Sequence, residues 1–300
     1  AELLKYHTLE AVMSMPDELF YPVGIVTCIM VFTANISHAT SNKKTWFGYW
    51  KKDGFEKTKH RGRIDVNHRW ERIREHWVEM YRNREVHAGE CVMQKVTADD
   101  EWCAEAYIET DYSIVKASHF ADAVKRYAAF KLGRPSPVGS KDFLPEQEGW
   151  KMFRLGDLFN IKKGKRLTKA NQTKGQVPFI GSIEGNNGVS SYIGQKPIHK
   201  GNTITVNYNG SVAESFYQPE PFWASDDVNV LYPKFTLNPA IALFIITIIR
   251  GEKYRFNYGR KWHMERMEQS YIKLPVDKSG EPDFSFMENY IKSLPFSSHI

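Results

Sequence analysis

A dense block of cationic side chains is the feature of this chain that most directly suggests a chemistry. Residues 151–175 contain eight Lys or Arg side chains and a single acid, Asp157. Cations at this density attract the phosphates of a polyanion such as a nucleic acid, although a run of charges can also be a solvated face. Gly164 predicts a sharp turn, so that several of the five cations around it can converge on one phosphate path: Lys162, Lys163, Lys165, Arg166 and Lys169.

Polar loops follow this block and supply side chains that can reach the edges of bases. The Asn-Gly pairs at 187–188 and 209–210 are turn signals that form hairpins by themselves, and their amides are also candidate base readers. Tyr208 can stack on a base, contact a phosphate or be buried. The candidate DNA-binding residues are the five cations named above together with Asn186, Asn187, Lys200, Tyr208, Asn209, Arg260 and Lys261.

Other chemistries find less support in the sequence. The chain has no Glu-x-Lys pattern, which metal-dependent nucleases use, and no Gly-x-Ser-x-Gly pattern. Asp226 and Asp227 are paired carboxylates without a third ligand nearby, so a turn or cap is expected there. The ten histidines are scattered, and His60 and His199, which lie among lysines, are expected to be exposed or close to phosphate. We therefore expect neither a catalytic nor a metal site.

Composition agrees with an acidic partner. The 300 residues carry a net charge of +6 and a pI of about 9.0, with 42% hydrophobic and 25% charged residues, which is ordinary for a globular protein but biased toward nucleic acid. Residues 43–74 hold eleven Lys or Arg against four acids, and they are a second candidate DNA face. Residues 97–111 hold six acids and no Lys or Arg, so that segment cannot face a phosphate backbone.

The cysteines and apolar runs favour a cytoplasmic protein. Cys28, Cys91 and Cys103 form no Cys-x-x-Cys pair, and Cys28 is expected to be a buried, reduced thiol. The longest apolar runs are too short to span a bilayer, and no signal peptide is recognisable. Because the chain begins at Ala1 within what resembles a fold, a longer parent polypeptide is expected.

The pattern of the first segment predicts mixed α/β structure. Strands are expected at 8–13, 25–32 and 45–50, and the continuous apolar run 25–32 predicts a strand buried on both faces. Apolar residues at helical spacing predict helices over 67–82 and 118–131. A Gly- and Pro-rich stretch from Gly133 predicts a linker.

The second segment alternates short strands with turns before two helices. Strands are expected at 203–206, 213–217 and 228–231, and a buried helix at 239–249 with Asn238 as its cap. A last helix at 283–294 carries one apolar face, which packs either on its own domain or on a second copy of the chain. That face consists of Met287, Tyr290, Ile291 and Leu294.

The order of motifs from Gly149 to the C-terminus resembles the target recognition domain of type I restriction-modification specificity subunits. The resemblance rests on the segments 150–157, 163–165, 178–181, 186–188, 207–211, 224–228 and 258–261. It implies a domain that reads a short DNA sequence in the major groove, with cations fixing register on phosphates and Asn, Gln, Ser and Lys discriminating bases.

The first segment resembles the last strands of an N6-adenine DNA methyltransferase domain, through Ser14–Pro22, Thr27–Phe32, Lys44–Tyr49 and Asp53–Lys59. The chain contains no Asn/Asp-Pro-Pro and no Gly-x-Gly. The resemblance therefore implies a non-catalytic chain without its own cofactor, whose parent uses S-adenosylmethionine. The alternatives are an active methyltransferase subunit and an assembly scaffold that does not bind DNA.

Together these observations predict an α/β protein in three parts. Residues 1–132 form a methyltransferase remnant with a helical connector, 133–145 a linker, and 146–300 a DNA target recognition domain that ends in a helix. The expected partners are double-stranded DNA, methyltransferase and restriction subunits of a bacterial defence system, or a second copy of the chain, with no membrane. Because the sequence has no internal repeat, a two-part target would require two copies or a second specificity chain.

Overall fold

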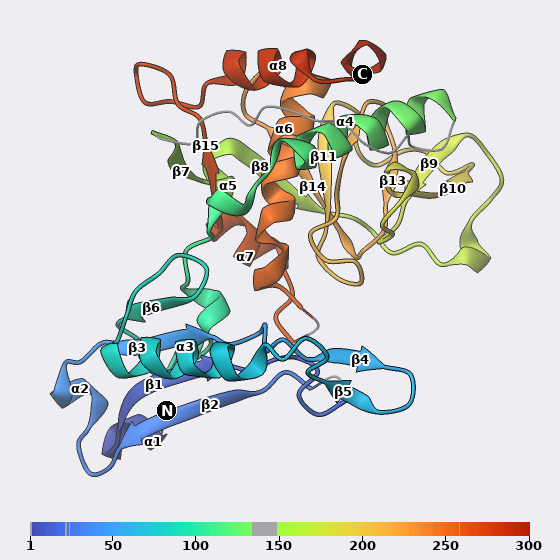
Figure 1. Cartoon of the computed structure of the whole chain (residues 1–300). Helices are drawn as coiled ribbons and strands as arrows, with labels where there is room; N and C mark the ends of the chain where they lie inside the picture. The colour runs from blue at the N-terminus through green and yellow to red at the C-terminus, as the bar shows by residue number, and fades with distance from the viewer. Residues whose placement is uncertain (1, 22, 24, 134–148, 258) are drawn as a thin grey trace. The chain divides into compact units, whose positions relative to one another are not determined.

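The computed structural model describes residues 2–21, 23, 25–133, 149–257 and 259–300. The chain divides into two compact units, Ala1–Asp111 and Tyr112–Ile300, and Figure 1 labels their elements. Each unit combines helices with sheets, which confirms the predicted mixed α/β class. The expected linker 133–145 lies, apart from Gly133, outside the described residues.

A four-stranded sheet is the centre of the first unit. Its order is β2-β1-β3-β6, with β1 parallel to β3 and antiparallel to β2. The predicted strands at 8–13 and 45–50 are confirmed as β1 and β3. The elements are α1 (Glu2–Tyr6), β1 (Thr8–Ser14), β2 (Cys28–Thr33), α2 (His38–Ser41), β3 (Thr45–Tyr49) and β6 (Cys91–Gln94).

Helix α3 (Trp70–Asn83) covers one face of this sheet and confirms the helix predicted at 67–82. Its inward side chains Trp77 and Met80 are buried in a cluster with Trp46 of β3 and with Trp50, which follows that strand. The rings of Trp50 and Trp77 stack with centroids 5.2 Å apart. The unit also contains a two-stranded ribbon, β4 (Glu56–Thr58) and β5 (Gly62–Ile64), and the short helix η1 (Ala104–Ala106).

The predicted burial of strand 25–32 is wrong. The strand forms as β2, but it is an edge strand whose first three residues are exposed and whose last three are half-buried. Cys28 is correspondingly exposed rather than buried. An apolar run specifies a strand that favours burial, but neighbouring elements determine whether a strand is covered, and β2 has a hydrogen-bonded neighbour on one side alone in the described sheet.

The second unit contains one four-stranded and one three-stranded sheet, ordered β12-β11-β14-β8 and β10-β9-β13, and the pair β15-β7. The predicted strands at 203–206, 213–217 and 228–231 are confirmed, the middle one displaced by about two residues. The strands are β7 (Lys151–Arg154), β8 (Phe159–Lys163), β9 (Val177–Ile180), β10 (Val189–Ile193), β11 (Thr203–Asn207), β12 (Ser215–Gln218), β13 (Trp223–Ala224), β14 (Val228–Pro233) and β15 (Tyr271–Leu274).

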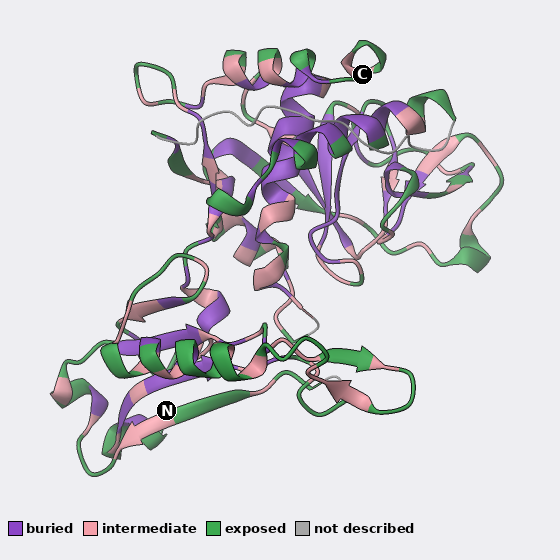
Figure 2. Ribbon diagram, viewed as in Figure 1, coloured by how far each residue is buried: buried purple, intermediate pink, exposed green. Residues whose placement is uncertain are grey.

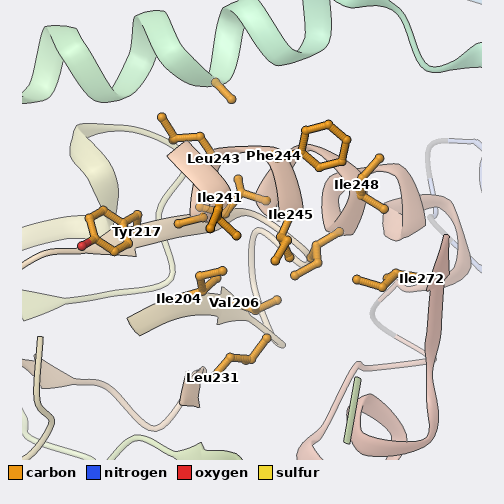
Figure 3. Packing of buried hydrophobic residues seen from close by; sticks show 14 of the residues in the cluster. Ile204, Val206, Tyr217, Leu231, Ile241, Leu243, Phe244, Ile245, Ile248 and Ile272 are labelled. Atoms are coloured by element: carbon orange, nitrogen blue, oxygen red, sulfur yellow. The ribbon is translucent and has the colours of Figure 1, made fainter. Parts of the chain in front are cut away.

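The core of this unit is built around α6 (Pro239–Gly251), which confirms the predicted buried helix. The side-chain oxygen of Asn238 accepts a hydrogen bond from the Ile241 amide at 2.9 Å, and Pro239 occupies the first turn. Every residue from 240 to 249 is buried, so the helix is covered on all sides. Figure 3 shows side chains of α6 facing Ile204 and Leu231 of the sheet.

Two further helices, one before and one after it in the chain, pack against α6: α4 (Ala117–Leu132) and α8 (Phe284–Ser293). Figure 2 shows their buried inner faces. Helix α4 packs with α6 through Phe120, whose ring centroid lies 4.8 Å from that of Phe244. It therefore belongs to the second unit by its contacts, whereas the sequence analysis assigned it as a connector to the first segment. The remaining α-helices in the described part of this unit are α5 (Leu155–Leu158) and α7 (Met264–Gln269).

The apolar face of α8 packs on its own unit. Met287 and Ile291 are fully buried and Leu294 nearly so, and the Tyr290 ring lies 5.3 Å from Phe120 and 6.0 Å from Phe244. The helix forms as predicted, but the alternative in which this face contacts a second copy is wrong, because α4 and α6 already cover it.

Candidate nucleic-acid interface

Four loops of the second unit are joined by backbone and side-chain hydrogen bonds at the ends of β8, β9, β11 and β13. The Gly164 amide donates to Val228 O, the Lys165 amide to Ala224 O and the Ser225 amide to Ile180 O, each at 2.9 Å. We call residues 164–168, 181–185, 208–213 and 224–227 the loop cluster. Because both sheets contribute to it, the loop cluster is fixed to the folded core rather than suspended on a single turn.

Gly164 is required at this place by close packing. A Cβ atom at residue 164 would lie 2.1 Å from the carbonyl oxygen of Ser225 and 2.7 Å from that of Ala224. Such separations are far below van der Waals contact, so only glycine lets β8 approach the end of β13. The prediction that glycine is needed here is kept, but the reason differs from the sharp turn that the sequence analysis proposed.

Side-chain hydrogen bonds fix the tips of the other loops. The Asn209 amide donates to Asp227 Oδ1 at 2.8 Å, and the Ser182 hydroxyl donates to Asn209 O. The Asn207 amide, which is fully buried, donates to Ile183 O at 3.1 Å. Asn209 and Asp227 therefore hold each other, and Asp227 has the structural turn role expected for this acid pair.

Three of the predicted cations lie in or next to the loop cluster and are exposed: Lys163, Lys165 and Arg166. The Lys163 ammonium lies 5.2 Å from the Tyr208 ring centroid. A hydrogen bond with the Tyr208 hydroxyl and the negative charges of Asp226 and Asp227 raise the pKa of Lys163, so it is a permanent cation. Tyr208 thus holds Lys163 in place, whichever contact it makes with a ligand.

Lys162 points away from these cations. Successive residues of a strand alternate between the two faces of a sheet, and Lys162 pairs with Val230 while Lys163 pairs with Asn229. The Lys162 ammonium accordingly lies over the Tyr232 ring, 5.1 Å from its centroid. Lys162 therefore lies on the face of β8 opposite to Lys163 and is not among the cations gathered at the loop cluster. Lys169 is exposed in a separate short helix, η3 (Lys169–Asn171).

The asparagines at 186 and 187 have roles in a turn. Both have positive φ angles, 48° and 51°. The Asn187 amide is buried and donates to Tyr217 O at 2.7 Å, and the Asn186 amide donates to Val189 O at 2.7 Å. The side chain of Asn187 is inaccessible to a base in this arrangement, whereas Asn186 is exposed beside the loop cluster.

Arg260 and Lys261 belong to a segment that packs on α7. Arg260 donates to Arg255 O at 3.0 Å and lies over the Phe256 ring. The carbonyl of Lys261 accepts from Arg266 at 2.6 Å, and the next residue, Trp262, is fully buried. The side chain of Arg260 and the backbone of Lys261 are therefore held by contacts within the folded unit. The preceding Tyr258 lies outside the described residues.

His199 is buried, which corrects the expectation that it is exposed or close to phosphate. Its ring stacks on Phe222 with centroids 5.3 Å apart, and Nδ1 lies 2.8 Å from the Tyr232 hydroxyl. Burial and the nearby charge of Lys162 lower the pKa of His199 from 6.5 to about 4. The neighbouring Lys200 is exposed, which shows that proximity to lysines does not predict exposure.

This burial makes stability depend on pH. The folded state resists protonation of His199 until about pH 4, whereas the unfolded state binds the proton below about 6.5. Stability from this residue is complete above pH 6.5 and is lost as pH falls to 4, by about 3 kcal/mol in total. We expect the free energy of urea unfolding to lose this pH-dependent part in the variant His199→Gln. The variant His60→Gln, at an exposed histidine, should keep it. Equal pH profiles for all three proteins would contradict the assignment.

Sequence reasoning did not identify two contributors to the loop cluster. The indole nitrogen of Trp223 donates to Lys165 O at 2.8 Å and so fixes the backbone of the cationic loop. The Asp226 carboxylate lies 3.8 Å from the Arg166 guanidinium and is about a third exposed (36%). The acid pair at 226–227 is visible in the sequence. That the Asp226 carboxylate lies among the cations of the loop cluster is visible only once the loops are brought together by the fold.

In the described part of the chain, no group of three or more His, Cys, Asp or Glu side chains could hold a metal ion. No helix within the described ranges is long and apolar enough to cross a membrane.

A DNA specificity domain is the class of protein that the second unit matches. Residues 147–297 match the family model of the Type I restriction modification DNA specificity domain, and residues 1–132 match that of N-6 DNA Methylase. The chain belongs to the Type I restriction modification DNA specificity domain family. This confirms the resemblance recognised in both segments of the sequence.

Two proteins of Heyndrickxia coagulans are similar to parts of the chain. The specificity subunit S.BcgI of a type II restriction enzyme is 40% identical over 144 residues, which are 47% of this chain and 42% of the relative. The type II restriction enzyme and methyltransferase RM.BcgI is 30% identical over 133 residues, 44% of this chain and 20% of the relative. The matches therefore span less than half the length of these relatives.

Among solved structures, two specificity subunits resemble the chain. The S subunit of a type I restriction-modification system from M. genitalium has a TM-score of 0.40 at 15% identity, covering 58% of this chain and 44% of the other. The HsdS subunit of Thermoanaerobacter tengcongensis has a TM-score of 0.38 at 13% identity, covering 60% and 44%.

Proposed function

We propose that this chain recognises a short sequence in duplex DNA and positions an adenine methyltransferase on it. The loop cluster is the observation that carries the proposal. Exposed cations able to hold phosphates stand there beside the polar tips of loops, on a domain of a DNA specificity family. Phosphate contacts fix register and side chains in the groove discriminate bases, and the loop cluster supplies both kinds of group.

The proposal extends to partners and to the place of the chemistry. A methyltransferase subunit is the proposed protein partner, with a restriction subunit or a second copy of the chain as further components, in the cytoplasm. We assign S-adenosylmethionine to the parent protein rather than to this chain, because the chain lacks the glycine-rich and Asn/Asp-Pro-Pro motifs. Donor binding by the isolated chain would favour the rival function, an active methyltransferase subunit.

Selection from a randomised duplex library tests the function. The 300-residue chain should enrich one short sequence, and the enriched duplex should bind more tightly than a scrambled duplex of equal length. If all sequences are recovered equally and the affinity depends on salt concentration alone, the chain does not recognise a DNA sequence. No binding at low salt would favour an assembly scaffold.

Asp226 is proposed to read a base within that target. A carboxylate is repelled by phosphates but accepts a hydrogen bond from the amino group of cytosine in the major groove, and Asp226 is the acid of the pair that does not hold Asn209. Asp226→Asn should relax the preference at one base pair by roughly 5- to 150-fold, corresponding to about 1–3 kcal/mol. The measurement is competition binding between the enriched duplex and its single-base variants.

Asp157→Asn is the matched control, since Asp157 is exposed and pairs with Arg154 at 2.6 Å in another part of the unit. It removes the same charge and should leave the preference unchanged. If Asp226→Asn merely tightens binding to all duplexes equally, Asp226 contributes general repulsion and does not read a base.

A further inference from the structure

The β4–β5 ribbon of the first unit separates neutralised cations at its base from free cations at its tip. At the base, Arg63 donates to Asp53 Oδ1 at 2.6 Å, and Lys57 pairs with Glu18. The acid Glu56 accepts a hydrogen bond from Asn67 at 2.6 Å. The carboxylates near the ribbon are thus engaged at its base.

The tip carries three exposed basic side chains, Lys59, His60 and Arg61. Over the described residues, none of their side chains has an ion pair or a side-chain hydrogen bond with the rest of the chain. Figure 2 shows the turn between the two strands as exposed surface. Such an unbalanced cluster concentrates positive potential at one point and favours an anionic ligand.

The turn that presents these side chains is well defined. The Thr58 hydroxyl donates to Gly62 O at 3.0 Å, and the Arg61 amide donates to Thr58 Oγ1 at 3.1 Å. Gly62 has a φ of +68°, a left-handed conformation that glycine adopts without steric cost. The tip is therefore held in one backbone conformation, which lowers the entropy lost on binding.

The ribbon is also anchored to the body of its own unit. Phe55, which precedes β4, contacts Trp70 of α3 edge to face with ring centroids 5.7 Å apart. The Arg63 guanidinium lies over the Phe55 ring at 5.6 Å. Figure 1 shows the ribbon reaching away from the four-stranded sheet. Anchoring at the base and projection at the tip are the features of an arm that reaches a ligand outside the unit.

We propose that the tip of the β4–β5 ribbon is a second contact with duplex DNA, one that grips the phosphate backbone without regard to sequence. The ammonium of Lys59 and the guanidinium of Arg61 are phosphate ligands, and no carboxamide or carboxylate for reading bases stands between them. The identity of the ligand as DNA rests on the proposed function, whereas the contact itself is separate from the loop cluster. It adds affinity and leaves discrimination to the second unit.

The double variant Lys59→Ala/Arg61→Ala in the 300-residue chain tests this contact. Each lost phosphate contact lowers the slope of log affinity against log salt by about 0.9. We expect a slope about 2 units shallower and an affinity roughly tenfold weaker near physiological salt, on both enriched and scrambled duplexes. The base preference on the library should not change.

The control Arg82→Ala/Lys95→Ala removes the same charge from exposed positions of the first unit outside residues 43–74 and should change the slope much less. The proposal would be overturned if both pairs of substitutions had equal effects, or if the ribbon pair had none. A changed base preference would also overturn it. So would tighter binding of the chain, through the ribbon tip, to duplex RNA or to an acidic peptide than to duplex DNA. If the wild-type chain shows no base preference while the ribbon effect persists, the recognition function fails and the ribbon contact stands.

Discussion

Replacing Lys163, Lys165 and Arg166 together by alanine is expected to weaken duplex DNA binding by roughly 100-fold near physiological salt and to flatten the salt dependence by almost 3 units. These three exposed cations lie in or next to the loop cluster, and each phosphate contact contributes about 0.9 to the slope of log affinity against log salt. Fluorescence anisotropy of a labelled duplex across a salt series measures both quantities.

Two controls separate this contact from net charge. Lys131, Lys278 and Lys292 are exposed outside the loop cluster, and their joint replacement by alanine should leave the slope nearly unchanged. Lys162→Ala should also have a smaller effect than Lys163→Ala, since the two ammonium groups lie on opposite faces of β8. If the variant lacking Lys163, Lys165 and Arg166 shows the same salt dependence as the wild-type chain, the DNA face lies elsewhere. Residues 43–74 are then the next candidate.

Gly164→Ala is expected to destabilise the second unit and to abolish selective binding. The added methyl group would lie 2.1 Å from Ser225 O, so β8 or the end of β13 must move, and forced backbone shifts of this kind cost about 1–3 kcal/mol or more. That cost corresponds to a melting temperature lower by roughly 2–12 °C for a unit of this size. Thermal unfolding and competition binding measure the two effects.

Gly185→Ala is the matched control, because residue 185 lies in the same loop cluster with nothing within 4 Å of an added Cβ and with an extended backbone. It should stay within about 0.5 kcal/mol of the wild-type stability. A Gly164→Ala protein that unfolds like the wild type and keeps its base preference would show that the contact between β8 and β13 is not needed.

Periodicity and capping predict the helices of this protein from sequence. Asn238 before Pro239 and an unbroken apolar run define α6, and the stripe on α8 defines its buried face. Strand burial was harder to predict, because the run that forms β2 is as apolar as a central strand yet lies at an edge. The composition of a run does not determine which strands will flank it.

The candidate site was predicted in composition but not in arrangement. The period-2 alternation of strands could have separated Lys162 from Lys163, but only if β8 had been recognised through to Lys163. The burial of His199 depends on Phe222 and Tyr232, which are 23 and 33 residues away. Asp226 is a candidate site residue because it lies close to Arg166, which is sixty positions earlier in the chain. Contacts at such separations are set by sheet order, which no local pattern in this sequence encodes.

The placement of α4 has a consequence for exchanging specificities between related proteins, whether by recombination or by engineering. Phe120 and Val124 of α4 are fully buried in the core of the second unit, and the Tyr112 hydroxyl donates to Glu252 at 2.6 Å and accepts from the Lys273 amide at 3.0 Å. A crossover in the apparent linker after Gly133 would join one parent's helix to another parent's core. The exchangeable cassette therefore begins upstream of Tyr112, with α4 as part of the inherited module.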